Sequence, residues 1–250
     1  MSASLNVALL SHTPEPERAV AAAGRLCYSQ STAVELKEQM TADEVERLVK
    51  LLVNTGHLST FEHASFTFGI DGISRACSHQ LVRHRLASYS QQSQRYVPFS
   101  DEEGFIIPPK IAGDPESLAV FQEAMRSAKE AYDRLVELGR ERGLEKETIQ
   151  EDARFVLPNA AETRIVVTMN ARELRHFFHV RCCRRAQWEI NSLAWRMLFL
   201  VRDVAPLLFR KTGAACLYGK CSEGKMYCGE DYTKEQVAEM EARWMEPSGR

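Results

Sequence analysis

The sequence has no long apolar run, no excess of positive charge and few aromatic residues. Nothing approaches the roughly 18 consecutive apolar residues of a membrane-spanning helix, so we expect no membrane segment. The start of the chain has neither basic residues nor a long apolar stretch, which argues against a signal peptide. A net charge of -2 argues against a general nucleic-acid binder, whose positive charge would normally dominate.

The chain also lacks internal repeats, low-complexity tracts and obvious linkers. Its 250 residues can bury a full core, and we expect one domain over residues 1–250. Seven cysteines, an odd number, favour reduced thiols over a disulfide framework and predict a cytoplasmic protein.

Hydrophobic patterns and capping residues predict strands and long helices in mixed order. Thr41 and Glu44 form a capping box at the start of one helix, and Gly56 follows its end. Strands are expected at 6–10, 61–70, 105–107 and 163–170, and helices at 14–24, 42–55, 73–85, 114–143, 144–156, 172–180 and 186–204. We expect a loop at 87–94. Because the strands and helices do not repeat as regular strand–helix–strand units, the fold class is predicted to be α+β.

Hydrogen-bonding side chains are concentrated where acidic residues are absent. From Gly72 to Ser100 there is no acid, while Arg75, Arg83, Arg85 and Arg95 are all present. Uncompensated guanidinium groups, with amides and hydroxyls between them, are suited to bind phosphates and carbonyl oxygens. We therefore predict an anion site in this stretch.

A second acid-free stretch lies between Glu173 and Glu189 and contains four arginines and two histidines. Solvated helix faces are the alternative explanation for any single arginine of either stretch. Taken together, the two stretches predict one shared site for an anionic ligand.

Several blocks resemble one enzyme family. Arg83-His84-Arg85, followed after seven residues by Ser93, resembles the Arg-His-Arg-x7-Ser signature of the flavin-dependent thymidylate synthases. Further blocks at 56–63, 154–158, 168–172 and 186–190 resemble that family in the same order. The tail 213–250 is the part to which the resemblance contributes least.

The resemblance implies a fold, a reaction and an assembly. The fold would be a curved antiparallel sheet with helices in a single domain, of the thymidylate synthase-complementing type. The reaction would be methylation of dUMP to dTMP, with carbon from methylenetetrahydrofolate and electrons from NADPH passing through FAD. The enzymes of this family are similar in being homotetramers whose sites combine several subunits.

The resemblance also implies which residues bind ligands. Contacts with dUMP would come from Gln80, Leu81, Val82, Arg83, Gln91, Gln92, Ser93, Gln94, Arg95, Arg154 and Arg181. Contacts with FAD would come from Ser59, Arg83, His84, Arg85, Gln91, Asn170, Ala171, Arg172 and His176. Arginine, histidine and asparagine are apt partners for a pyrophosphate and for the carbonyl edge of a flavin.

Two of these residues invite a catalytic role. Ser93 could be read as a nucleophile, but an activated serine needs an adjacent base and an orienting third group, and the sequence marks no such acid near His84. We therefore predict that Ser93 binds phosphate. Arg181 is the better catalytic candidate, because a guanidinium at the uracil edge stabilises negative charge on the ring.

Other positions leave alternatives open. Gln91 stands where many members of the family carry Glu, which changes the charge beside both ligands. His57 and Glu62-His63 are metal ligands by residue type alone, but the resemblance places them near the flavin, and we predict no metal. Free thiols, a metal site or redox-responsive pairing would each explain the cysteines of the last third of the chain, which are Cys182, Cys183, Cys216, Cys221 and Cys228.

A second class of function would use the same arginines for binding alone, without catalysis. A nucleotide-binding or nucleic-acid-binding module would need only the anion site. A nucleic-acid binder should also show interleaved surface aromatics and a basic total charge. This chain has 8% aromatic residues and a slightly acidic balance, which favours the enzyme and argues against nucleic acid as a partner.

Overall fold

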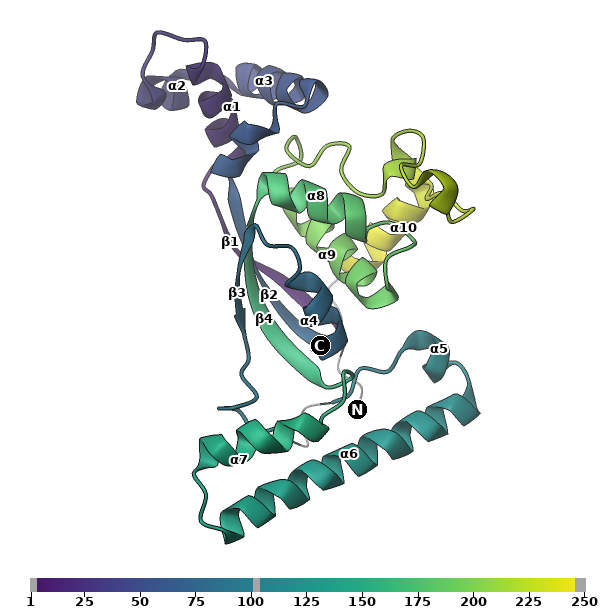
Figure 1. Cartoon of the computed structure of the whole chain (residues 1–250). Helices are drawn as coiled ribbons and strands as arrows, with labels where there is room; N and C mark the ends of the chain where they lie inside the picture. The colour runs from purple at the N-terminus through teal and green to yellow at the C-terminus, as the bar shows by residue number, and fades with distance from the viewer. Residues whose placement is uncertain (1–3, 101–103, 246–250) are drawn as a thin grey trace. The chain divides into compact units, whose positions relative to one another are not determined.

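The computed structural model describes residues 4–100 and 104–245 (Figure 1). Four strands form one open antiparallel sheet in the order β1-β2-β4-β3. Their bounds are β1 Asn6–His12, β2 Ser65–Ser74, β3 Ala87–Gln91 and β4 Glu162–Asn170. Because helices are interspersed among these strands without regular strand–helix–strand units, the predicted α+β class is confirmed.

The chain folds into two compact units that alternate along the sequence. The first unit contains the described residues of 1–6, 70–82 and 90–165, and the second contains 7–69, 83–89 and the described residues of 166–250. Every strand has residues in both units. The single domain over 1–250 stays a prediction.

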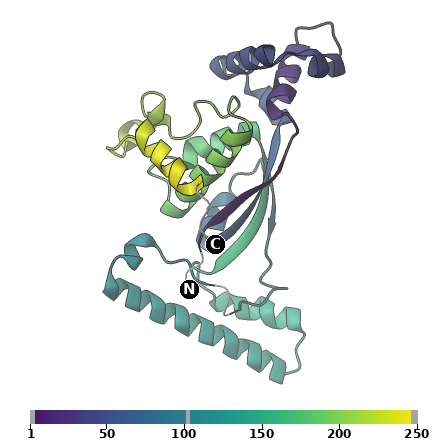
Figure 2. The same cartoon turned by 180° about the vertical axis from the view of Figure 1, so that it is seen from behind.

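The first unit is built around the long helix α6, Pro115–Glu141. Helix α7, Lys146–Ala153, packs along α6 (Figure 2), and the unit also holds α4 Arg75–Leu81, α5 Pro109–Ala112 and the short turn η2 Arg154–Val156. The backbone N–H of Phe99 donates to the hydroxyl of Tyr132 over 3.1 Å, and both side chains lie in a small core with Ala153 and Ala161. That core holds the segment after residue 90 against α6.

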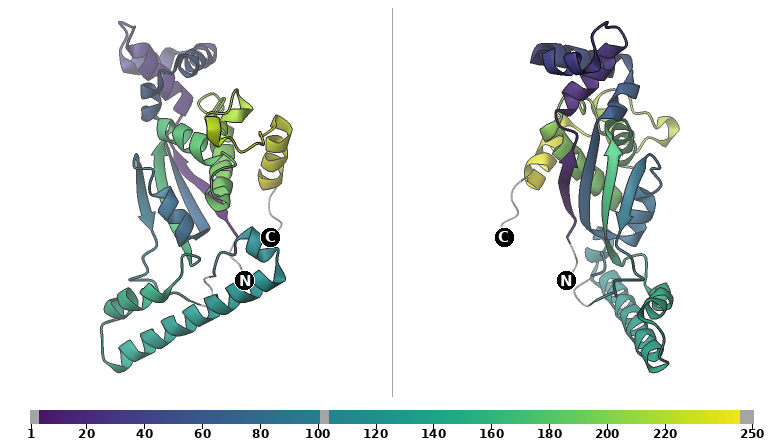
Figure 3. Two further views of the ribbon diagram at one scale, coloured as in Figure 1. Left: turned by 45° about the vertical axis from the view of Figure 1, so that its right-hand side comes forward. Right: turned by 90° about the vertical axis from the view of Figure 1, so that its left-hand side faces the viewer.

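The second unit holds the remaining helices. They are α1 Pro16–Leu26, α2 Ala33–Gln39, α3 Ala42–Thr55, η1 Leu58–His63, α8 Ala171–Arg181, α9 Trp188–Val204, η3 Ala215–Leu217, η4 Gly224–Met226 and α10 Lys234–Met245. Helix α9 packs between α8 and α10 (Figure 3). Phe177 and Phe178 of α8 are fully buried, as is Trp195 of α9. Burial of these large aromatic surfaces fixes α8, which carries several predicted site residues.

The start of α3 follows the sequence-based expectation. The Thr41 side chain accepts from the backbone N–H of Glu44, and the Glu44 carboxylate accepts from the backbone N–H of Thr41. Gly56 ends the helix with φ +73°, a left-handed conformation that glycine adopts without strain. The predicted start of the first helix at Pro14 is wrong, because Pro16 occupies its first turn. Helix α2 was not anticipated.

Two elements around the arginine-rich stretch differ from the expectation. The predicted loop at 87–94 begins with strand β3, in which Ala87, Tyr89 and Gln91 are partly buried and the serines between them are exposed. That alternation is the period of a strand, and small polar residues masked it in the sequence. The predicted helix at 73–85 is shorter, because β2 continues through Ser74, whose hydroxyl then caps α4.

Residues 105–107 do not form the strand expected for them, since only Phe105 pairs, in a single antiparallel bridge with Ala161. Within residues 4–100 and 104–245, no helix is both long and apolar enough to cross a membrane.

Candidate functional site

In the first unit, Arg75 and Arg154 form a cationic pair. Arg75 begins α4 and Arg154 follows α7, and both are partly buried. Burial and the nearby Arg154 charge lower the pKa of the Arg75 guanidinium. Within the described ranges neither guanidinium makes an ion pair, since Arg154 Nε donates only to the backbone carbonyl of Glu151, over 3.2 Å. Two desolvated cations without an acidic partner are suited to bind an anion.

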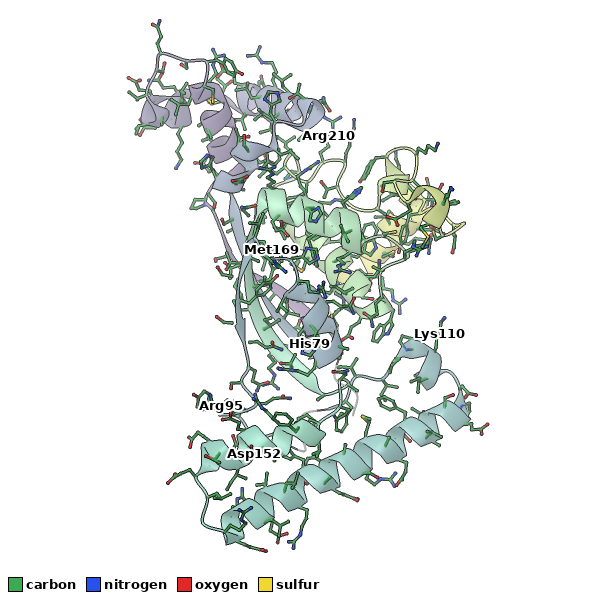
Figure 4. All side chains as sticks on the ribbon, in the orientation of Figure 1. His79, Arg95, Lys110, Asp152, Met169 and Arg210 are labelled. Atoms are coloured by element: carbon green, nitrogen blue, oxygen red, sulfur yellow. The ribbon has the colours of Figure 1, made fainter. Side chains whose placement is uncertain are left out.

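Arg95 lies beside α7 (Figure 4). Its Nε is 2.8 Å from Oε2 of Glu151, and both side chains are nearly half exposed. Glu151 therefore connects Arg95 through its carboxylate with Arg154 through its carbonyl. Two residues predicted to contact dUMP, Arg95 and Arg154, are thus brought together, and Arg75 lies near Arg154.

The residues of β3 and the turn after it are positioned by hydrogen bonds. Gln91 Nε2 donates to the hydroxyls of Ser78 and Thr163, over 3.0 and 3.1 Å. The hydroxyl of Ser93 accepts from the backbone N–H of Arg95 over 3.2 Å. In the described part of the chain no hydrogen bond joins the Ser93 hydroxyl to a basic or acidic side chain, and its role as a phosphate binder stays a prediction.

Helix α4 and its end present their predicted dUMP residues differently. Leu81 is fully buried, so it can reach a ligand only through its backbone. Gln80 is partly exposed and Val82 is exposed. After β3, the Gln92 backbone N–H donates to the Arg164 carbonyl over 2.9 Å, and the Gln94 side chain is partly exposed.

In the second unit, His84 connects Glu173 and Arg181. Its Nδ1 lies 3.3 Å from Oε1 of Glu173, and its Nε2 accepts from Nε of Arg181 over 3.1 Å. The side chains of His84 and Glu173 are only 7% and 8% exposed. The hydroxyl of Tyr89 donates to the backbone carbonyl of His84 over 2.8 Å. Both ring nitrogens of His84 are therefore engaged by other side chains.

Burial sets the charges in this network. Desolvation, followed by the charges of Arg181 and His176, lowers the pKa of His84 to about 4. Desolvation also raises the pKa of the Glu173 carboxyl, against a lowering effect of His176. Burial and the Glu173 charge raise the pKa of Tyr89. His84 is consequently neutral at pH 7.

A cavity of about 670 Å³ opens beside α8. It is lined by Leu58, Leu86, Arg172, Glu173, Arg175, His176, His179, Lys211, Thr212 and Gly213. Two predicted FAD residues, Arg172 and His176, therefore line one cavity. A third, Ser59, directly follows the lining residue Leu58 in the sequence. The volume is typical of small-molecule and cofactor sites.

The start of α8 holds the other predicted FAD residues. Asn170 caps the helix, because its side-chain oxygen accepts from the backbone N–H of Glu173 over 2.9 Å. Ala171 is fully buried, and its N–H donates to the carbonyl of Ala64. Arg172 Nη1 lies 2.5 Å from Oε1 of Glu62, so this acid of the 56–63 block neutralises an arginine of the 168–172 block.

Arg175 holds the loop that contributes Lys211, Thr212 and Gly213 to the cavity lining. It donates to the carbonyls of Leu208 and Arg210 and to the hydroxyl of Thr212, over 2.6, 3.1 and 2.6 Å. Burial lowers its pKa to about 10. These bonds tie the loop before Gly213 to α8, and with it Lys211, whose φ is +52°. Arg175 thus holds the cavity wall in place.

The side chains of two arginines of the signature make no hydrogen bond or ion pair within the described residues. These are Arg83 and Arg85, and both are exposed. Such cations are available to a ligand or to another molecule.

The predicted site residues fall into two clusters, one in each unit. Gln80, Leu81, Val82, Gln91–Arg95 and Arg154 belong to the first unit, while Ser59, Arg83–Arg85, Asn170–Arg172, His176 and Arg181 belong to the second. Sequence reasoning assigned no role to Glu151, Glu173 or Tyr89. Two features of the sequence could have indicated Arg75 and Glu173: Arg75 is one of the uncompensated arginines, and Glu173 borders an acid-free stretch. No such feature marks Glu151 or Tyr89.

The seven cysteines are all free thiols. Cys183, Cys216, Cys221 and Cys228 line a small cavity of about 20 Å³ together with His179. Across residues 4–100 and 104–245, no three His, Cys, Asp or Glu side chains are grouped as metal ligands. Burial raises the pKa of Cys182 strongly and that of Cys183 less.

Comparison with known proteins places these clusters in context. A family model described as thymidylate synthase complementing protein matches residues 8–207. The chain is 55% identical over 228 residues to a flavin-dependent thymidylate synthase of Geobacter sulfurreducens, covering 90% of this chain and 94% of that protein. It is 47% identical over 234 residues to one of Clostridium tetani, covering 90% and 94%.

A solved structure is also similar. It is the UMP/dUMP methylase PolB from Streptomyces cacaoi bound with 5-Br dUMP, with a TM-score of 0.72 and 25% identity, covering 84% of this chain and 97% of that one.

Proposed function

Since this chain belongs to the thymidylate synthase complementing protein family, whose curated relatives are flavin-dependent thymidylate synthases, we propose that it methylates dUMP to dTMP. The carbon comes from methylenetetrahydrofolate and the electrons come from NADPH. The observation that carries the proposal is the cluster of Arg75, Arg95 and Arg154, which offers three guanidinium groups and a single acid to a nucleotide phosphate.

The residues around the larger cavity fit FAD. Its volume is in the range of cofactor sites, Arg172 and His176 supply hydrogen-bond donors, and Lys211 supplies positive charge for a pyrophosphate. When bound, the flavin supplies the reducing equivalents of the methylation. Arg172 and His176 would hold it, and Glu62 would keep Arg172 oriented. Side-chain contact through His84 is disfavoured, because both ring nitrogens are already engaged.

The chain's own groups have distinct tasks toward dUMP. Arg75, Arg95 and Arg154 bind the phosphate, with the Ser93 hydroxyl as a further donor. Gln91, fixed by Ser78 and Thr163, presents an uncharged amide where a carboxylate would repel the nucleotide. Arg181 places its guanidinium at the pyrimidine edge and stabilises negative charge that develops on the ring.

Self-association into a homotetramer is part of the proposal. Val120 and Leu135 on α6 are 68% and 42% exposed, which leaves apolar surface on this helix without internal cover. Arg83 and Arg85 are likewise without internal partners in the described chain. A location in the cytoplasm stays a prediction.

The experiment is purification followed by two measurements. The protein should absorb near 375 and 450 nm, roughly the flavin bands, and release FAD on denaturation. Incubation with dUMP, methylenetetrahydrofolate and NADPH should yield dTMP, and omission of any one should abolish it. Flavin-containing protein that forms no dTMP under these conditions would show a nucleotide-binding protein without this chemistry.

A further inference from the structure

We propose that Glu173 and His84 act as a positioning relay that fixes the guanidinium of Arg181. The proposal rests on the proposed function, because it deepens the role given to Arg181 at the pyrimidine. Its basis is the chain of contacts from Glu173 Oε1 to His84 Nδ1, and from His84 Nε2 to Arg181 Nε, with separations of 3.3 and 3.1 Å.

The chemistry of arginine dictates where the proton of His84 lies. A guanidinium only donates hydrogen bonds, so Nε2 of His84 must present its lone pair to Arg181. The single proton of the neutral ring is then on Nδ1, which faces the Glu173 carboxylate. Glu173 accepts that proton's hydrogen bond and thereby selects the tautomer that Arg181 requires.

The surroundings keep the ring neutral. His84 is buried against Phe177, with ring centroids 4.9 Å apart, and His176 of α8 lies 6.0 Å away. The charged and titratable groups acting on it are Glu173, His176 and Arg181, and desolvation adds to the effect of the two basic neighbours. Protonation of His84 would place an N–H of the ring opposite the N–H of Arg181 and break the second contact.

The hydrogen bond from Arg181 Nε to His84 determines the direction of the two Nη groups of Arg181. The guanidinium is planar, so fixing Nε–H fixes the plane and the directions of both Nη groups. The backbone of Arg181 is held as well, because Asn191 Nδ2 donates to its carbonyl over 2.9 Å. With backbone and Nε both fixed, the donors aimed at the substrate are preorganised, which is the condition for transition-state stabilisation.

An isosteric replacement of Glu173 tests whether the contact of Glu173 with His84 positions Arg181 or only stabilises the fold. Glu173→Gln keeps the shape of the side chain but removes its charge, and because its amide can donate to Nδ1 as well as accept from it, the proton of His84 is no longer confined to Nδ1. Whenever that proton lies on Nε2, a donor faces the Arg181 donor. The expected result is a fall in kcat of at least about 10-fold, with a smaller change in the KM for dUMP.

A spectroscopic signature accompanies this loss. In protein labelled with ¹⁵N-histidine, the His84 nitrogens should show the Nδ1–H tautomer alone in the wild type and a mixture of this tautomer with the Nε2–H tautomer in Glu173→Gln. Glu17→Gln is the matched control, because Glu17 is also a partly buried glutamate in the first turn of a helix, where it accepts from the backbone N–H of Leu207. The control should retain the wild-type kcat and tautomer.

A double-mutant cycle separates the relay from an independent effect of Glu173. His84→Gln supplies an amide oxygen to Arg181 Nε without any need for tautomer selection. In that background Glu173→Gln should change kcat by less than about 3-fold. An equal loss in both backgrounds, or an unchanged tautomer with a normal kcat in Glu173→Gln, overturns the relay. Failure of the wild type to form dTMP would instead overturn the proposed function, while the tautomer of His84 still tests the relay.

Discussion

Arg75 and Arg154 are neighbouring cations, and the second makes the first easier to deprotonate. Within the described chain no carboxylate pairs with either guanidinium, so their mutual repulsion is relieved only by an added anion or by solvent. Such a pair costs stability in the free protein and contributes to binding when a phosphate arrives. This relationship gives the first prediction.

Arg75→Ala should weaken the binding of dUMP by about 10- to 100-fold, since a hydrogen bond to a charged group contributes about 1.5–3 kcal/mol. Isothermal titration of the protein with dUMP measures the effect. Arg126→Ala is the control, because Arg126 is exposed on α6 and pairs, among the described residues, only with Glu123. Equal affinities in the wild type and Arg75→Ala would remove Arg75 from the phosphate site.

Arg181 and Arg95 should separate the chemical step from binding. Arg181→Ala should lower the rate of dTMP formation by about 10²–10³, while dUMP binding weakens less. Arg95→Ala should raise the KM for dUMP, with a smaller effect on the rate of dTMP formation at saturating dUMP. Single-turnover formation of dTMP at saturating dUMP measures both. A near-normal rate in Arg181→Ala would make this arginine a binding residue only.

The depressed pKa of His84 predicts how stability depends on pH. The unfolded chain takes up a proton near pH 6.5, whereas the folded chain does so only near pH 4. The free energy of unfolding therefore falls as the pH drops through this window and is unaffected by His84 above it. Since one pKa unit corresponds to about 1.4 kcal/mol, the loss is about 3 kcal/mol.

Urea unfolding of the wild type and His84→Gln between about pH 7 and pH 4 checks this prediction. The wild type should lose more stability across the window than the variant. Parallel curves for the two proteins would mean that His84 titrates normally in the folded state.

Burial predicts the order in which the cysteines react. Cys182 is fully buried with a strongly raised pKa, so its thiolate is scarce and inaccessible. Cys27 and Cys228 are exposed. Timed alkylation followed by peptide mass spectrometry should label Cys27 and Cys228 first and Cys182 only after denaturation. Early labelling of Cys182 in folded protein would contradict the burial.

Sharing of sites between subunits predicts complementation. Arg83→Ala and Arg181→Ala should each be inactive alone, and mixing them under subunit exchange should restore part of the activity if a site combines different subunits. Light scattering of the wild type gives the size of the assembly. Verified exchange without any recovery would place Arg83 and Arg181 in the site of one subunit.

The sequence predicted the parts of the site that depend on residue type. Acid-free stretches located Arg75 and Arg181 because charge composition is a local property of the sequence. The partners of these residues could not be predicted in the same way. Glu173 meets His84 across 89 positions, and Gln91 meets Thr163 across 72, which are consequences of tertiary packing.

The same distinction applies to the fold. The capping box at Thr41 was predicted because all its groups lie within one turn. Strand β3 was missed because its two serines and a glutamine lack the side chains typical of strands, and pairing with β4 determines its conformation instead.

The alternation of the two units constrains the order in which the protein can fold. The bond between the Leu207 N–H and Glu17 closes 190 positions, and the ion pair of Arg172 with Glu62 closes 110. During synthesis, the partly buried carboxylate of Glu17 on α1 therefore meets its partner only after the last third of the chain has been made. Closing such long loops carries an entropic cost before contacts repay it, which favours slow folding. Until then the nascent chain exposes apolar surface, a period in which a chaperone would have most effect.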